Sequence, residues 1–224
     1  MNNPHSFKTV ATAIAFSPYL EANLHESTRI AEMLGSKLIL IHVGDRNKEN
    51  EDTLNRVLKG TGFDNSKITT IWKKGDPTET ILKACKEHNV DLLLAGAKKK
   101  EGLLTFYIGS VARNLSRNAT CSILILSERS VVRNPCKTVV VNGLNNPKTE
   151  DSVTTANMIG NAFGASKMVI VDEIDPKRIN VAADDDDGTE RANNLRTEIV
   201  ECENERLASL KENLTGQMSV STQC

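Results

Sequence analysis

The residue types that could bind an anion are gathered in one stretch: Gly96, Lys98, Lys99, Lys100, Gly109 and Ser110. The glycines allow backbone N–H groups to approach a phosphate, and the serine opens a segment with helical periodicity, whose first N–H groups also favour an anion. The lysines could pair with the same anion, or they could form an ordinary solvated loop. Likewise, Gly109-Ser110 could hold a phosphate or only cap a helix. The stretch predicts an anion site, and the two simpler interpretations stay open.

Elsewhere in the chain, the residue types that could catalyse a reaction or bind a metal lack the spacing of known catalytic motifs and metal sites. There is no Walker motif, no G-x-G-x-x-G after the first apolar run and no nucleophile-plus-base pattern, so no catalytic residue is predicted. His42 lies inside an apolar run and is interpreted as a core histidine. The four histidines and five scattered cysteines lack metal-ligand spacing, and the cysteines fit free thiols in a reducing compartment. We expect neither an enzyme nor a metal site.

Composition and charge exclude several classes of partner. The 224 residues are 39% hydrophobic and 25% charged, with a formal net charge of -1. Residues 1–130 carry about +4 and residues 131–224 about -5, and neither half has the clustered cations that nucleic-acid binding needs. The N-terminus lacks the pattern of a secretory signal, and no apolar run approaches the roughly 18 residues that span a bilayer. The sequence therefore predicts a cytoplasmic protein that binds neither nucleic acid nor membrane.

The elements that must position the anion stretch alternate between strands and helices. Short apolar runs, typical of buried parallel strands, are Thr9–Phe16, Lys37–Val43, Lys67–Trp72, Leu92–Ala95 and Cys121–Leu126. Between them, helices are expected from Ser17-Pro18 to Gly35, at Glu51–Leu58, from Pro77 with Asp76 as its cap, and from Ser110 with apolar residues at Val111 and Leu115. This alternation predicts an α/β fold with a parallel sheet and helices on both faces. Open sheets of this kind bind ligands at the carboxyl edge, where the anion stretch lies.

The segment from Asp91 to Leu126 resembles the nucleotide loop of the universal stress protein family. ATP-binding members of that family carry Gly, two residues, Gly, nine residues and Gly-Ser. The matching positions here are Gly96, Lys99 and Gly109-Ser110, so the first and last match and a lysine replaces the middle glycine. The resemblance implies an open, Rossmann-like α/β domain whose five parallel strands have the order 3-2-1-4-5.

The resemblance also implies which residues would meet a nucleotide. Val43 takes the position of the adenine wall, although a plain core valine is an equal interpretation, and Ala15 stands where ATP-binding members have an aspartate. We therefore expect ATP, the cofactor that the resemblance implies, to bind weakly or not at all. The full set of implied site residues is Val43, Gly96, Lys98, Lys99, Gly109 and Ser110.

The second half of the chain repeats the beginning of the first. Residues 138–141 mirror residues 9–12, and the sequence around Ser166-Lys167 mirrors that around Ser36-Lys37. The predicted division is a complete domain at 6–128, a linker at 129–136 and a truncated second copy at 137–224. That copy contains an expected acidic loop at 172–188, a long helix and a third strand at 217–224. The apolar side of the helix is predicted to hold Leu195, Ile199, Cys202, Leu210 and Leu214.

These observations favour a non-enzymatic, stress-response binding or scaffold module with a degenerate nucleotide site. The alternative is a nucleotide-binding regulator, with weak ATP hydrolysis as one version, that uses the loop of Gly96, Lys99, Gly109 and Ser110. The resemblance further implies pairing through the fifth strand. Because the truncated second copy supplies no such strand, we expect a homodimer through Ser122–Leu126 of two first domains.

Overall fold

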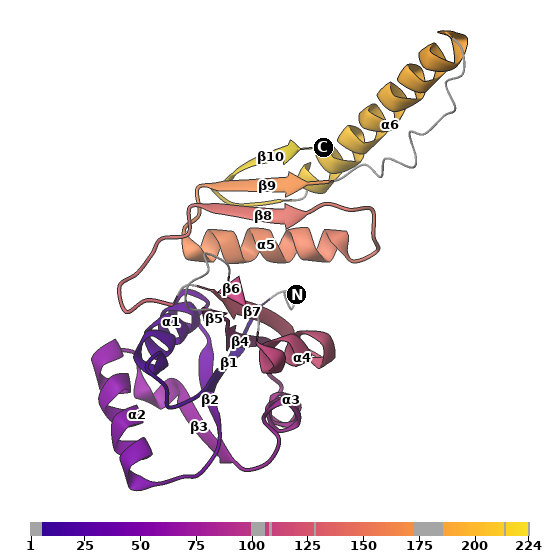
Figure 1. Cartoon of the computed structure of the whole chain (residues 1–224). Helices are drawn as coiled ribbons and strands as arrows, with labels where there is room; N and C mark the ends of the chain where they lie inside the picture. The colour runs from indigo at the N-terminus through magenta and orange to yellow at the C-terminus, as the bar shows by residue number, and fades with distance from the viewer. Residues whose placement is uncertain are drawn as a thin grey trace. The chain divides into compact units, whose positions relative to one another are not determined.

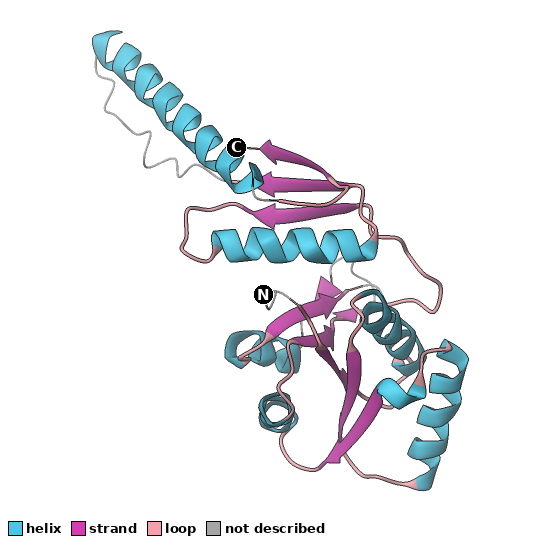
Figure 2. Cartoon of the chain, turned by 180° about the vertical axis from the view of Figure 1, so that it is seen from behind, coloured by secondary structure: helices cyan, strands magenta, loops and turns pink. Residues whose placement is uncertain are grey.

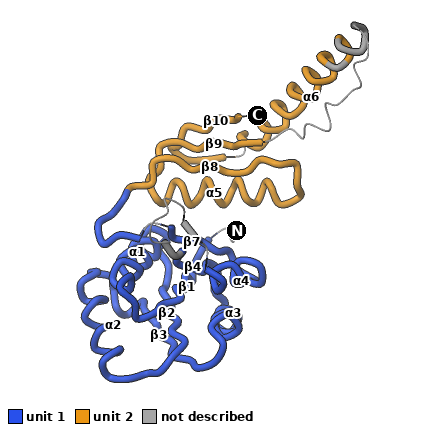
Figure 3. The backbone as a smooth tube through the Cα atoms, viewed as in Figure 1, with its two compact units in different colours: residues 1–134 blue, residues 135–224 orange. Residues whose placement is uncertain are grey.

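The computed structural model describes residues 6–99, 106–107, 109–127, 129–172, 186–212 and 214–223. The chain forms two compact units, Met1–Asn134 and Pro135–Cys224, coloured separately in Figure 3. Within the described ranges, no helix is both long enough and apolar enough to cross a membrane.

The first unit is built on a five-stranded parallel sheet (Figure 1). Its strands are β1 (Thr9–Ile14), β2 (Lys37–Val43), β3 (Ile68–Lys73), β4 (Leu92–Gly96) and β7 (Ser122–Leu126). They lie in the order β3-β2-β1-β4-β7, so the predicted order 3-2-1-4-5 is confirmed. In the centre of the sheet, Val10 of β1 is in register with Leu38 of β2 on one side and Leu92 of β4 on the other. All three side chains are buried, as expected for strands that are covered on both faces.

Helices cover both faces of this sheet (Figure 2). They are α1 (Leu20–Met33), α2 (Lys48–Thr61), α3 (Pro77–Glu87) and α4 (Ser110–Asn118), with a single 3-10 turn η1 (Asn65–Lys67) before β3. Helix α1 packs beside α2, and α3 packs beside α4. Between β4 and α4 the chain forms a small antiparallel pair, β5 (Lys98–Lys99) with β6 (Phe106–Tyr107).

The starts of the helices follow the expected capping chemistry in some places and not in others. The carboxylate of Asp76 accepts a hydrogen bond from the N–H of Glu79 at 3.0 Å, so the predicted start of α3 is confirmed. The predicted start of α1 at Ser17-Pro18 is wrong, because α1 begins at Leu20. The Ser17 hydroxyl instead accepts a hydrogen bond from the N–H of Tyr19 at 3.3 Å, which satisfies a local turn.

Helix α4 also turns a different side to the core than the sequence suggested. Leu115 is 1% exposed, as expected for a core position, but Val111 is 38% exposed and its neighbour Ala112 is buried. A short helix that opens at the edge of a sheet leaves its first turn only partly covered. This partial exposure places Val111 beside the cavity described below.

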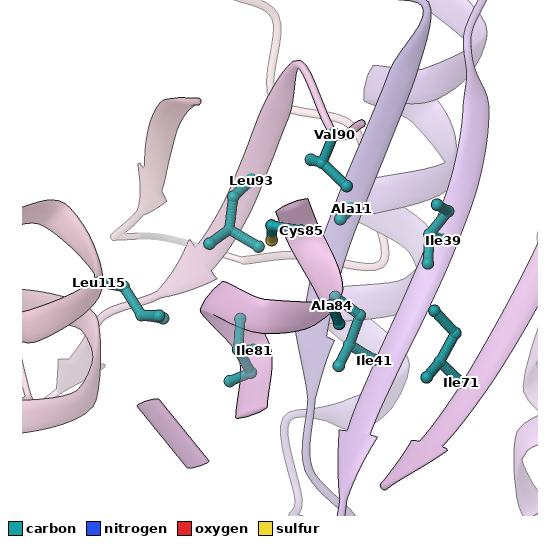
Figure 4. Packing of buried hydrophobic residues seen from close by; sticks show 10 residues of the cluster. All are labelled: Ala11, Ile39, Ile41, Ile71, Ile81, Ala84, Cys85, Val90, Leu93 and Leu115. Atoms are coloured by element: carbon teal, nitrogen blue, oxygen red, sulfur yellow. The ribbon is translucent and has the colours of Figure 1, made fainter. Parts of the chain in front are cut away.

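The main core cluster of the first unit lies between the sheet and α3 (Figure 4). It contains Ala11, Ile39, Ile41, Ile71, Ile81, Ala84, Cys85, Val90, Leu93 and Leu115. Burying an aliphatic side chain of this size contributes about 2 kcal/mol relative to leaving it exposed. The cluster therefore fixes α3 and the end of α4 against the strands that carry the predicted site.

The second unit repeats the first three strands of the first. Its elements are β8 (Thr138–Asn142), α5 (Thr149–Phe163), β9 (Lys167–Val171), α6 (Asp186–Glu212) and β10 (Ser219–Gln223). The sheet is parallel with the order β10-β9-β8, which matches β3-β2-β1. Its core is formed by Val153, Ala165, Met168, Ile170, Leu207 and Met218.

The same hydrogen bond recurs at the entrance to both sheets. In the first unit, the hydroxyl of Ser36 donates to the carbonyl oxygen of Phe7. In the second unit, the hydroxyl of Ser166 donates to the carbonyl oxygen of Lys137 at 3.2 Å. Each serine directly precedes the second strand of its sheet, and each acceptor lies just before the first strand. The sequence repeat is therefore also a repeat of local structure.

Two expectations for the second unit need correction. The acidic stretch 172–188 is not all loop, because Asp172 is buried after β9 and residues 186–188 belong to α6; residues 173–185 lie outside the described part. Acidic residues suit the positive end of a helix dipole, which accounts for the helical start.

The predicted apolar side of α6 is also wrong in part. Leu207 is fully buried, whereas Cys202 is exposed. The neighbouring Arg206 donates hydrogen bonds to the carboxylates of Glu203 and Asp172, and to the carbonyl oxygen of Gly143 at 2.6 Å. Burial opposes the charge of Arg206, but hydrogen bonds and charges from Glu203 and Asp172 raise its pKa on balance. The side of α6 that faces the core therefore carries both Leu207 and this ion-pair network.

Candidate functional site

A cavity of about 270 Å³ opens at the carboxyl edge of the first sheet, between the ends of β1, β2 and β4 and the starts of α3 and α4. Its wall is largely apolar. The lining includes Ile14, Ala15, Val43, Ile81, Val111 and Leu115. In an open α/β sheet this is the edge at which ligands bind, because the loops that leave the strands diverge there. The cavity therefore lies where the sequence placed the anion site.

His42 is the titratable side chain among the described residues of the cavity wall. It is 9% exposed, and its Nδ1 lies 3.2 Å from the carbonyl oxygen of Ile14, so this nitrogen carries the proton and donates. Its ring meets Phe16 edge-on with centroids 4.9 Å apart, and Trp72 edge-on at 5.1 Å. Phe16 and Trp72 stack at 5.8 Å. The histidine is thus a buried, hydrogen-bonded part of an aromatic cluster that borders the cavity.

The structure brings four of the predicted site residues to this region. Val43, at the end of β2, and Gly96, at the end of β4, line the cavity. Gly109 is buried and caps α4 without a side-chain hydrogen bond, and Ser110 is the exposed first residue of that helix. The next residue, Val111, lines the cavity. The N–H groups that open α4 therefore lie beside the apolar wall.

The predicted lysines are located only through their backbone. Lys98 pairs with Tyr107 and Lys99 pairs with Phe106 in the β5–β6 pair. Their side chains, and the whole of Lys100, lie outside the described part of the structure. Because of this pairing, the backbone is extended at Lys99, the position where the family pattern has its second glycine.

Sequence reasoning missed Arg129, which lies at the same edge of the sheet. Its guanidinium donates hydrogen bonds to the carbonyl oxygen of Ala97 at 2.6 Å and to the side-chain oxygen of Asn23 at 3.0 Å, and it lies 4.9 Å above the centre of the Tyr19 ring. A side chain at Gly96 would collide with this guanidinium. Burial lowers the pKa of Arg129, with the charge of Tyr19 acting in the opposite direction. Arg129 follows β7, far from Gly96 in sequence, so no spacing rule could have joined the two.

The geometry suits a ligand with an apolar part and an anionic part. Apolar side chains form the cavity wall, the opening turn of α4 supplies partial positive charge, and Arg129 places a full positive charge next to Gly96. Within the described residues, no group of three or more His, Cys, Asp or Glu side chains is arranged to hold a metal ion.

Comparison with known proteins identifies the fold family. Residues 45–127, which include β3, α3, β4, α4 and β7, match the model of the universal stress protein family. This part of the chain is therefore similar in sequence to the universal stress protein family. The match contains Gly96, Gly109 and Ser110, and the remaining strands of the same sheet complete the universal stress protein fold.

Two curated universal stress proteins are similar to part of the chain. YxiE from Bacillus subtilis (strain 168) is 37% identical over 57 residues, which are 25% of this chain and 38% of that protein. MJ0531 from Methanocaldococcus jannaschii is 30% identical over 81 residues, which are 36% of this chain and 48% of that protein. The matched part therefore spans less than half the length of either relative.

A solved structure is similar to both units together. It is the crystal structure of a protein from Pseudomonas aeruginosa UCBPP-PA14 that is assigned to the universal stress protein family. The matched region covers 98% of this chain and 74% of that protein. The TM-score is 0.67 and the sequence identity is 13%. At this identity the likeness concerns the fold, and it includes the second unit as well as the first.

Proposed function

We propose that the chain is a non-enzymatic stress-response module that binds a nucleotide weakly in the cavity of its first unit. The proposal rests on one observation: the apolar cavity lies beside the first turn of α4, which begins at Gly109 and Ser110. A base would lie against Val43, and a phosphate would approach the N–H groups of α4. The cavity volume of about 270 Å³ lies just below the range for small-molecule sites, roughly 300–1,000 Å³, which also fits weak binding.

Two departures from the family pattern explain why the affinity is expected to be low. Ala15 presents a methyl group to the cavity, where ATP-binding members have an aspartate that can accept a hydrogen bond. Lys99 stands in the position of the second glycine, and its backbone is committed to the pair with Phe106. A polar ligand group that loses its hydrogen-bond partner on binding costs about 1–3 kcal/mol. Together these changes weaken the hold on both the ribose and the phosphates.

Calorimetry with the full chain and ATP tests the proposal. We expect a dissociation constant weaker than ~1 μM, which corresponds to about -8 kcal/mol. Trp72, the only tryptophan, gives a second readout because its ring contacts His42, which lines the cavity. A dissociation constant of ~1 μM or tighter would overturn the proposal and favour the nucleotide-binding regulator.

Variants of the loop separate the two functions. If the regulator interpretation holds, Gly109→Val and Ser110→Ala should weaken ATP binding, and Lys99→Gly should leave it intact or strengthen it. Gly60→Val is a matched control, because Gly60 is exposed on α2 and has open space where a side chain would begin. Release of inorganic phosphate from ATP, measured with the same variants, tests the weak ATPase version.

We also propose that two chains pair through β7. This strand is bonded to β4 on one side, and among the described residues no strand pairs with its other edge. The N–H of Ser122 donates to the carbonyl oxygen of Asp91, and the carbonyl oxygen of Leu126 accepts from Ala97. Backbone groups alternate along a parallel ladder, so those of Ile123 and Ile125 face the open edge. An unpaired edge of this kind is a template for a second copy.

The remaining features of the proposal concern organisation and location. We divide the chain into a first domain at 6–128, a linker at 129–136 and a second domain at 137–224. The start of the linker is held to the first unit, because Arg29 donates hydrogen bonds to the carbonyl oxygens of Ser130 and Val131. A cytoplasmic location fits the free cysteines of the described residues, since thiols persist in a reducing compartment. Fractionation of cells that produce the chain would test the location.

A further inference from the structure

Two cysteines that are far apart in the sequence meet at the edge of the first core. Cys85, in the last turns of α3, is 4% exposed, and Cys121, directly before β7, is half-buried and packs against the same cluster. The backbone fixes both positions to the segment that enters β4. The N–H of Val90 donates to the carbonyl oxygen of Cys85 at 2.9 Å, and the N–H of Ser122 donates to that of Asp91 at 3.1 Å. Figure 4 shows the sulfur of Cys85 among the side chains of this cluster.

The two thiols are not equivalent. They share a hydrogen bond, which together with burial raises the pKa of Cys85 and keeps its proton in place. The same hydrogen bond lowers the pKa of Cys121 to about 7, with burial acting in the opposite direction. Of the two side chains, Cys85 is the more deeply buried and Cys121 the more accessible. A buried protonated thiol beside a more exposed thiolate is the arrangement of a resolving and an attacking cysteine.

We propose that Cys121 and Cys85 form a peroxide-responsive dithiol, in which Cys121 is oxidised first and Cys85 then closes a disulfide. The Cys121 thiolate attacks one oxygen of hydrogen peroxide, the O–O bond breaks, and the products are a sulfenic acid and hydroxide, which takes up a proton to become water. The Cys85 sulfur then attacks the Cys121 sulfur and releases a second water with its own proton. Two thiols are oxidised and one peroxide is reduced to two waters. The proposal is independent of nucleotide binding, since neither sulfur lines the cavity.

The disulfide would close a loop that contains the predicted nucleotide segment. Residues 86–120 include β4 with Gly96 and α4 with its opening residues Gly109 and Ser110. A covalent link at the ends of this loop restricts the freedom of the chain between them. Oxidation is therefore expected to make the first unit more resistant to thermal unfolding, and reduction should reverse the change.

The experiment uses the full chain with Cys136→Ser, Cys202→Ser and Cys224→Ser, which leaves only the proposed pair. After treatment with an equimolar amount of hydrogen peroxide, we expect the intact mass to fall by about 2 Da, for two hydrogens. Digestion should yield one cross-linked peptide pair containing Cys85 and Cys121, and dithiothreitol should remove the link. In the same background, Cys85→Ser should stop the reaction at Cys121 sulfenic acid, which dimedone traps.

Two outcomes would overturn the proposal. In the first, the mass of the triple variant rises by oxygen added at Cys121, and the loss of two hydrogens is not seen. In the second, neither Cys85 nor Cys121 reacts with peroxide, whereas the exposed Cys202 of the unmodified chain is oxidised. If the triple variant does not fold, differential alkylation of the unmodified chain gives the same decision. The labels on Cys85 and Cys121 should then disappear together at peroxide levels that leave Cys202 labelled. Loss of the Cys202 label first, or loss at Cys121 alone, counts against the pair.

Discussion

The guanidinium of Arg129 occupies the space into which a side chain at Gly96 would project. A side chain at this position would therefore have to displace the guanidinium from its hydrogen bonds. The arginine joins the end of β4, through Ala97, to Asn23 and Tyr19 at the start of α1. The fold thus holds a positive charge at the carboxyl edge of the first sheet.

Arg129→Ala should destabilise the first unit by about 2 kcal/mol, because two hydrogen bonds from a charged donor and its packing on Tyr19 are lost. Urea unfolding followed by Trp72 fluorescence measures the change. Arg117→Ala is the matched control, since Arg117 is exposed on α4, and it should change stability by less than about 0.5 kcal/mol. Equal effects of the two variants would show that the contacts of Arg129 contribute nothing beyond those of a surface arginine.

Ile125→Pro should convert the expected dimer into a monomer. Proline removes an N–H that faces the open edge of β7. The bond that Ser122 donates to Asp91 and the bond that Leu126 accepts from Ala97 stay in place. Ile125→Val keeps this N–H and should remain dimeric. Size-exclusion chromatography with light scattering at ~100 μM measures the mass, and circular dichroism checks the fold. A monomeric unmodified chain, or a folded proline variant that still pairs, contradicts the proposed edge.

The alkylation rate of Cys121 should rise with pH through a midpoint of about 7. The sign follows from the lowered pKa, because the reactive thiolate forms as the pH rises past that value. Cys85→Ala removes the other thiol of the hydrogen bond, so the midpoint should move up toward the ordinary thiol value of about 8.5. Iodoacetamide labelling, with peptide masses resolved for Cys121, gives both curves. Coincident curves would mean that Cys85 has no influence on its neighbour.

Arg206→Ala should destabilise the second unit by about 3 kcal/mol, because the cation between the buried carboxylates of Asp172 and Glu203 is removed. Denaturation followed by far-ultraviolet circular dichroism measures the loss. Arg196→Ala, an exposed position on the same helix, is the control and should have little effect. If Arg206→Ala lowers the free energy of unfolding no more than Arg196→Ala does, the ion-pair network contributes no more to stability than a surface contact.

The strands were predictable because short apolar runs separated by polar and helical segments are typical of a buried parallel sheet. Their order came from the resemblance to the universal stress protein family, since periodicity alone does not fix it. The capped start of α3 followed from the local sequence at Asp76. The start of α1 was misjudged because Ser17 has two ways to satisfy a backbone N–H, as a cap or in a turn, and the sequence does not distinguish them.

The site was predictable only where its residues follow one another closely along the chain. Gly96, Gly109 and Ser110 lie within one crossover, so their common place at the edge of the sheet follows from topology. Arg129 approaches Gly96, and Cys121 approaches Cys85, only after the whole sheet is assembled. Contacts between elements of this kind depend on packing, which no spacing rule encodes.

The serine bonds at the two sheet entrances, Ser36 to Phe7 and Ser166 to Lys137, have a historical consequence. Duplication of one ancestral segment leaves such matched side-chain bonds in both descendants, whereas independent origins would have little reason to choose the same hydroxyl for the same carbonyl. Each copy then became free to diverge, and the arginines that mark the two halves differ accordingly. Both arginines donate to the carbonyl oxygen of a residue that follows a sheet strand, Arg129 to that of Ala97 and Arg206 to that of Gly143, but only Arg206 also pairs with Asp172 among these contacts. The two copies thus share the bond at the sheet entrance and differ in the groups that their arginines contact.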